Sequence, residues 1–169
     1  MAAELELPLV TVIDTAGAEL SPAAEQGALA GEIARCLADL SQLPVAAVSV
    51  LLGMGCGGGA LALLPADRVL AAAHSWLSPL PLEGASVIRY RTADHAAKMA
   101  ELQRVGAADL QAAGIVDLVI AERPDAADEA NAFTARVLAA VADQLSELDV
   151  LPAIQRRAAK RARYGGGPR

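Results

Sequence analysis

Aromatic side chains are scarce in this sequence of 169 residues, which has one Phe, one Trp and two Tyr. The apolar fraction is nevertheless 54%, so the core must consist mainly of Ala, Val, Leu and Ile. Small side chains let helices and strands pack closely, but each of them buries little area. The length suits a single core. We expect a partner surface to complete it, in a homo- or hetero-oligomer.

Cysteines are also few. Cys36 and Cys56 cannot form a disulfide framework, and they fit a reducing, cytoplasmic setting. No basic segment followed by an apolar run opens the chain, so we expect no secretory signal. The longest near-apolar stretch, residues 43–64, has five glycines within residues 53–59. It is predicted to form a strand, a loop and the start of a helix rather than a membrane span.

Basic residues are concentrated at the end of the chain, although the net charge is −6. Residues 156–169 contain no acid and six basic residues: Arg156, Arg157, Lys160, Arg161, Arg163 and Arg169. The acidic remainder argues against nucleic-acid binding, which requires a basic face. We predict that residues 150–169 form a basic helix and tail. Residues 156–169 could bind an anion or an acidic partner surface, but we expect them to extend into solvent, so that their removal changes stability little.

Short apolar runs alternate with helical patterns along the chain. Strands are predicted at residues 9–13, 45–52, 68–72 and 116–120, and residues 76–78 extend the third strand or start another. A helix is predicted from Pro22 to about residue 41, with Ser21 as its N-cap. A short helix is predicted between the glycine segment and residue 64. Further helices are predicted at residues 83–90, 93–103, 107–113, 128–148 and 152–163. This order predicts an α/β layered fold with a parallel sheet.

The glycine segment fits the dinucleotide-binding pattern G-x-G-x-x-G at Gly53, Gly55 and Gly58. That fingerprint needs an acid at the end of the next strand, and residues 68–74 contain none. A Walker motif is absent as well. Consecutive glycines at a helix N-terminus expose backbone N–H groups, which can stabilise an oxyanion in acyl or carboxyl transfer. The alternative is a tight strand–helix connection packed against another backbone, but five glycines in seven residues favour a ligand-facing loop.

Several motifs resemble the α-subunit type of acetyl-CoA carboxylase carboxyltransferase, a family with the crotonase (ClpP-like) fold. The resemblance covers about residues 8–122 and rests on IDTAGA (13–18), EQG (25–27), EIAR (32–35), GCGGGALA (55–62), ADRV (66–69), PLEGAS (81–86) and GIVD (114–117). It implies a spiral of ββα-type units over residues 1–149, lacking the first strands of the usual domain. Ala16 replaces the family's usual Pro, and residues 19–21 replace Tyr-Pro-Gly, so we expect a differently shaped first loop.

The resemblance also implies a reaction. Carboxybiotin, on a biotin carboxyl carrier protein, gives CO2 to the enolate of an acyl-CoA that a β-type half holds. With acetyl-CoA this yields malonyl-CoA for fatty-acid biosynthesis. The α-type half faces biotin, and its Gly58, Gly59 and Ala60 would donate N–H bonds to the ureido oxygen, where charge builds as CO2 leaves. The surrounding biotin pocket would be formed by Gly17, Ala18, Gly55, Gly57, Glu83 and Gly84.

Two other functions stay open: another crotonase-fold acyl-CoA enzyme, such as a decarboxylase or hydratase, and a non-catalytic partner that completes another subunit. Residues 60–66 lack the carboxylates that a hydratase needs. Glu83 is either near the site or simply a first-turn carboxylate favoured by the helix dipole.

The remaining reactive side chains suggest no separate site. His74 and His95 are predicted to be surface or structural histidines. Together with Cys36 and Cys56 they lack zinc-ligand spacing, so no metal site is expected. The serines that a ClpP-like interpretation would favour are not surrounded by G-x-S-x-G and are discounted as nucleophiles: Ser75, Ser78 and Ser86.

Overall fold

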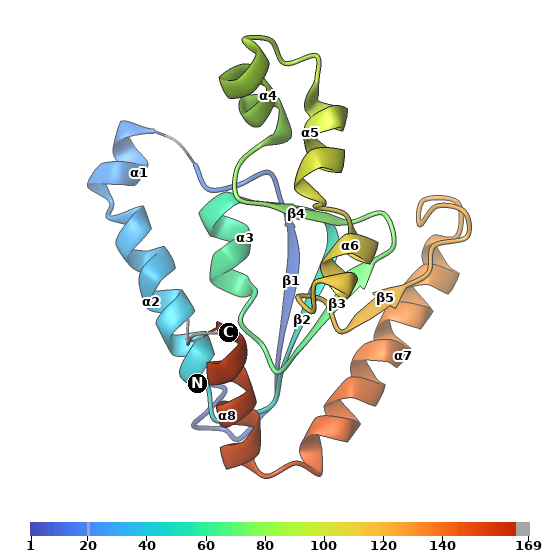
Figure 1. Cartoon of the computed structure of the whole chain (residues 1–169). Helices are drawn as coiled ribbons and strands as arrows, with labels where there is room; N and C mark the ends of the chain where they lie inside the picture. Colours follow the sequence, from blue (N-terminus) through green and yellow to red (C-terminus); the bar gives the residue numbers. More distant parts are fainter. Residues whose placement is uncertain (20, 165–169) are drawn as a thin grey trace.

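A parallel sheet forms the centre of the molecule in the computed structural model, which describes residues 1–19 and 21–164 (Figure 1). The strand order is β1-β2-β3-β5, and β4 pairs with the end of β2. The strands are β1 (Leu9–Thr15), β2 (Ala47–Cys56), β3 (Arg68–Ala72), β4 (Trp76–Ser78) and β5 (Leu118–Ile120). Each pairing between them is parallel, which confirms the predicted α/β class with a parallel sheet.

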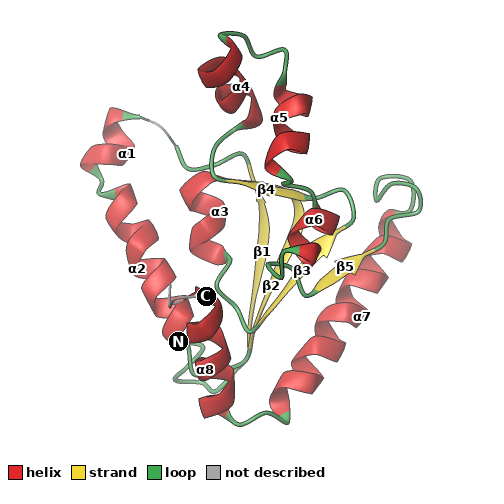
Figure 2. Cartoon of the chain, in the orientation of Figure 1, coloured by secondary structure: helices red, strands yellow, loops and turns green. Residues whose placement is uncertain are grey.

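Helices cover both faces of this sheet (Figure 2). They are α1 (Pro22–Gln26), α2 (Leu29–Gln42), α3 (Gly57–Leu63), α4 (Leu82–Tyr90), α5 (Ala96–Gln103), α6 (Ala107–Ala112), α7 (Ala130–Asp149) and α8 (Ala153–Tyr164). On one face, Leu51 of β2 belongs to the same core cluster as Leu110 of α6. On the other, Val50 of β2 belongs to the same cluster as Phe133 of α7. Successive residues of β2 therefore build two separate cores.

The predicted glycine loop is wrong in its first half, because β2 continues through Cys56 and α3 begins at Gly57. The extension is held by β4, which pairs Met54 with Trp76 and Gly55 with Leu77. A Cβ atom at Gly55 would lie 2.8 Å from Leu51 Cδ1 and 2.9 Å from Leu77 Cδ1. Glycine here permits the close approach of two strands, so this part of the segment is not a free loop.

The predicted single helix after Ser21 is two helices. Ser21 is the N-cap of α1 and accepts a hydrogen bond from the Ala24 N–H at 3.1 Å, as expected. The helix ends after one turn, where Ala28 takes a left-handed conformation with φ of 58°. That conformation cannot continue a right-handed helix, so the chain restarts as α2 and changes direction (Figure 1).

The basic C-terminal helix does not extend freely into solvent, which contradicts the prediction for it. Helix α8 lies beside α2 (Figure 1). Lys160 is 2% exposed, and its ammonium donates to the Leu43 carbonyl at 3.0 Å and lies 3.4 Å from Asp67. Arg163 donates two hydrogen bonds to Asp117, at 2.9 and 2.5 Å. Arg169 lies outside the described residues.

Both acids that hold α8 also fix the start of a strand. Asp67 accepts a hydrogen bond from the Ala47 N–H at 2.9 Å, and Asp117 accepts one from the Val69 N–H at 2.7 Å. These acids belong to the ADRV and GIVD motifs. Their carboxylates therefore connect the sheet backbone to the last helix.

Strand β1 forms the edge of the sheet. Its Val10 and Val12 are 40% and 55% exposed. They are aligned with Val48 and Val50 of β2, which α7 covers, but the helix does not cover β1 itself. An apolar edge of this kind is suited to a partner surface. None of the described helices has the length and apolar character that a membrane crossing requires.

Candidate functional site

The first turn of α3 presents three of the predicted site residues. Helix α3 follows β2 directly, with Cys56 as an N-cap whose side chain makes no capping hydrogen bond. The first N–H groups of a helix have no acceptor within it. Among the described residues, the N–H groups of Gly58, Gly59 and Ala60 make no hydrogen bond outside α3 either. Gly58 and Gly59 are partly exposed, so their N–H groups are available to an acceptor from outside, whereas Ala60 is buried in the core.

The segment after β1, which contains the predicted site residues Gly17 and Ala18, meets this turn. A Cβ atom at Gly59 would lie only 3.3 Å from the Ala18 nitrogen, so the two backbones are in close contact. Gly17 has a φ of 124°, and a Cβ atom there would lie 3.6 Å from the Cys56 carbonyl. The parallel pairing of β1 with β2, which aligns Thr15 with Gly55, brings the two segments together.

The neighbouring glycines have different surroundings. A Cβ atom at Gly58 would lie 3.0 Å from Ile33 Cδ1 of α2, whereas one at Gly57 would lie 3.7 Å from the Pro79 carbonyl. Gly57 has a φ of 62°, which side chains rarely tolerate. Packing at Gly58 therefore disfavours a large side chain, and backbone conformation disfavours any side chain at Gly57. The two interpretations of the glycine segment, close packing and ligand binding, are compatible.

The predicted wall of the pocket begins α4. Glu83 lies in the first turn of this helix and is exposed, and Gly84 follows it. Burial, and secondly the negative charge of Glu83, raise the pKa of the Cys56 thiol. The charge of Glu83 therefore acts on the thiol of the α3 N-cap.

This electrostatic effect is testable by alkylation. Cys56 is 1% exposed and its pKa is raised, so an alkylating reagent at pH 8 should modify the half-buried Cys36 first. Replacing Glu83 by Gln should lower the pH at which Cys56 becomes reactive. Mass spectrometry of both peptides across a pH series measures this, and an unchanged profile for Cys56 would contradict the assigned position of Glu83.

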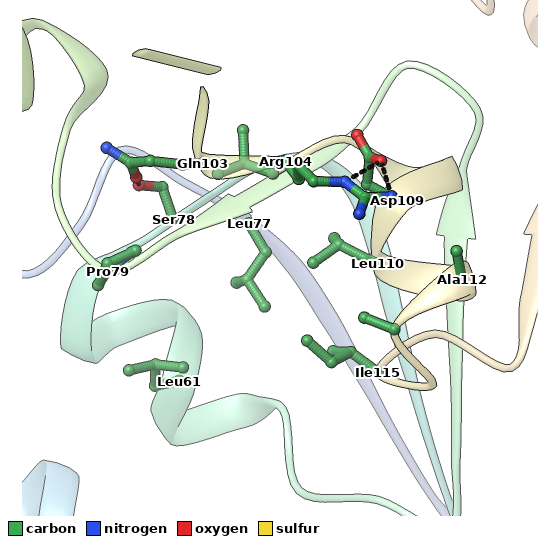
Figure 3. Close-up of a pocket in the computed structure, with 12 residues that line it drawn as sticks. Leu61, Leu77, Ser78, Pro79, Gln103, Arg104, Asp109, Leu110, Ala112 and Ile115 are labelled. Carbon is green, nitrogen blue, oxygen red and sulfur yellow. Dashed lines mark hydrogen bonds and ion pairs between the residues drawn. The ribbon is translucent and has the colours of Figure 1, made fainter. Parts of the chain in front are cut away.

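An apolar hollow of about 590 Å³ adjoins α3 (Figure 3). Leu61 of α3 and Leu77 of β4 line it, together with Leu110 of α6 and Ile115. The Arg104–Asp109 ion pair, at 2.8 Å, lies at its edge. No pattern in the sequence points to this hollow, because its lining comes from segments that only the fold brings together.

The histidines and serines have local partners. His95 lies edge-on to Tyr90, with ring centroids 4.6 Å apart, and His74 contacts Glu122. Each of the three serines donates a hydrogen bond to a backbone carbonyl, which is a structural role: Ser75 to Ala72, Ser78 to Leu80 and Ser86 to Thr92.

The parallel sheet and the glycine-rich junction between β2 and α3 define a crotonase-fold protein of the carboxyltransferase type. The chain belongs to the acetyl co-enzyme A carboxylase carboxyltransferase-like family, whose model matches residues 1–166. This confirms the resemblance seen in the sequence motifs.

Two curated relatives are much longer than this chain. The probable biotin-dependent acyl-coenzyme A carboxylase beta3 subunit of Mycobacterium tuberculosis is 56% identical over 97% of this chain and 33% of its own length. The acetyl-coenzyme A carboxylase carboxyl transferase subunits beta/alpha of Saccharopolyspora erythraea is 39% identical over 94% of this chain and 28% of its own length. The chain thus spans about a third of these relatives.

A solved structure gives the same assignment. Transcarboxylase 12S, determined with methylmalonyl-coenzyme A and methylmalonic acid bound, superposes with a TM-score of 0.62 and 26% identity. The match covers 80% of this chain and 28% of that one. The crotonase fold is therefore supported both by sequence and by structure.

Proposed function

We propose that this chain forms the biotin-facing half of an acyl-CoA carboxylase carboxyltransferase. In this role it works with a β-type half that holds the acyl-CoA and with a biotin carboxyl carrier protein. Acetyl-CoA is the proposed acceptor, giving malonyl-CoA for fatty-acid biosynthesis in the cytoplasm. Family membership supports the reaction class, and the contact between the Ala18 backbone and the first turn of α3 carries the site assignment.

The donor set fits a ureido oxygen, because it consists of backbone N–H groups at a helix start with no bulky side chain to block approach. Carboxybiotin would supply the CO2, and negative charge would build on its ureido oxygen as the CO2 leaves. The N–H groups of Gly58, Gly59 and Ala60 would donate to that oxygen and lower the barrier, because they are already oriented before charge develops.

The other predicted residues shape the surrounding pocket. Gly17 and Ala18 form the wall across from α3, and Gly57 lets the chain turn from β2 into the helix. Gly55 contributes through its backbone, while Glu83 and Gly84 border the opening from α4. This arrangement would orient the biotin ring for the transfer step.

Co-expression with a β-type half tests this function. The chain alone should transfer no carboxyl group, because the acyl-CoA site lies on the partner, whereas the complex should carboxylate an acyl-CoA in the presence of carboxybiotin. Radiolabelled CO2 transfer to acetyl-, propionyl- and longer acyl-CoA measures both activity and chain-length preference. A stable complex that transfers nothing would instead favour the non-catalytic partner, and biotin-independent release of CO2 would favour a decarboxylase.

A further inference from the structure

Three side chains with metal-binding atoms meet at the carboxyl ends of two neighbouring strands. His74 follows β3 and Glu122 follows β5, and these parallel strands align Ala72 with Ile120. Asp125 comes from the segment after Glu122. One ligand atom from each of the three residues lies within 4.8 Å of the others. The register of the sheet therefore brings together residues that are far apart in the sequence.

Glu122 is held firmly in this cluster. Its side chain is 6% exposed, and its two oxygens accept hydrogen bonds from the His74 and Ala126 N–H groups, both at 3.0 Å. One of these oxygens also lies 3.2 Å from His74 Nδ1. If this oxygen and His74 Nδ1 each bound one zinc ion at about 2.1 Å, their separation of 3.2 Å would correspond to a ligand–metal–ligand angle of about 100°. The pair thus already has the spacing of neighbouring ligands.

The local charge favours a cation. Glu122 and Asp125 contribute two carboxylates, and among the described residues Glu122 has an ion pair with His74 alone, whereas Asp125 has none. The nearby Arg136 is already paired with Glu129. A single imidazole cannot neutralise both acids, while a divalent cation can.

We propose that His74, Glu122 and Asp125 form a binding site for a divalent transition-metal ion such as Zn²⁺. One imidazole nitrogen and two carboxylate oxygens are suitable ligands for this ion, and water completes the coordination. Asp125 is exposed, so its side chain rotates toward the other two ligands on binding. The ion then fastens the segment that joins β5 to α7 to the end of β3.

Zinc titration of the full chain tests this site. Isothermal calorimetry or equilibrium dialysis with ZnCl₂ should show one equivalent bound. The variants His74→Asn and Asp125→Asn should each weaken binding by more than about tenfold, since loss of even an outer partner of a metal ligand has that effect. Asp125→Asn keeps an oxygen that can accept the hydrogen bond of the Ala127 N–H, so the segment should remain folded.

The matched control is His95→Asn, which removes the only other histidine and should leave binding unchanged. The Co²⁺ complex should lack thiolate charge-transfer absorption, which separates this site from Cys36 and Cys56. Absent binding to the natural chain, unchanged binding after His74→Asn, an equal loss after His95→Asn, or strong thiolate absorption would each overturn the proposal.

Discussion

Replacing Gly59 by alanine should lower carboxyl transfer by up to about 10²–10³-fold, because displacing one oxyanion donor from its acceptor has about the same effect as losing it. The new Cβ atom would lie 3.3 Å from the Ala18 nitrogen and 3.5 Å from the Gly17 carbonyl carbon. Both contacts are with backbone, which yields less readily than the end of a side chain. The segment after β1 should therefore shift by a few tenths of an ångström away from α3 and change the spacing of the site.

Gly58→Ala is the matched control one residue earlier. Its Cβ atom meets the end of the Ile33 side chain at 3.0 Å, and this flexible end can rotate away. Both variants keep every N–H group, so only the separation of the two backbones differs between them. Transfer rates in the assembled enzyme, with acyl-CoA binding measured in parallel, distinguish the outcomes. Near-normal transfer by Gly59→Ala, or an equal loss in both variants, would refute the assigned site.

Replacing Lys160 by methionine should lower the free energy of unfolding by about 3–5 kcal/mol, as is typical when a buried ion pair loses one partner. Methionine preserves much of the side-chain volume but leaves the buried carboxylate of Asp67 without its cation. Burial lowers the pKa of Lys160 and the Asp67 carboxylate opposes this shift, because burial disfavours an ionised group and an opposite charge favours it.

Urea denaturation of the full chain measures this effect. Arg161→Ala, on the exposed side of the same helix, should change the unfolding free energy by no more than about 0.5 kcal/mol. Adding Asp67→Asn to Lys160→Met should restore much of the loss, because it removes the unpaired charge while an amide oxygen still accepts from Ala47. If Lys160→Met behaves like Arg161→Ala, α8 is not anchored by this ion pair.

Local sequence patterns were sufficient to predict most elements. The strand at Arg68–Ala72 matches the prediction exactly at both ends, because a short apolar run lies between turn residues. Ser21 and Pro22 correctly predicted where the first helix starts, since capping depends on neighbours only a few residues away. The same is true of the family motifs, whose spacing along the chain already implied the crotonase fold.

Other boundaries depend on distant residues. Residues 53–56, which include Gly53 and Gly55, look like a loop because glycine is unfavourable in an isolated strand. They continue β2 nevertheless, because β4 pairs with residues 54–56. The candidate oxyanion site combines both kinds of information. Its glycines are visible in the sequence, whereas the contact between Gly59 and Ala18 arises only from the pairing of β1 with β2.

The sequence by itself determined the α/β class, the family and the glycine-rich helix start, because these follow from short-range patterns. Only the tertiary structure decided that Lys160 is buried against a carbonyl 117 residues away, and that His74 meets an acid 48 residues away. The apolar hollow beside α3 belongs to this second group. Such contacts depend on sheet register and helix packing, which bring together residues whose separation along the chain carries no signal of their meeting.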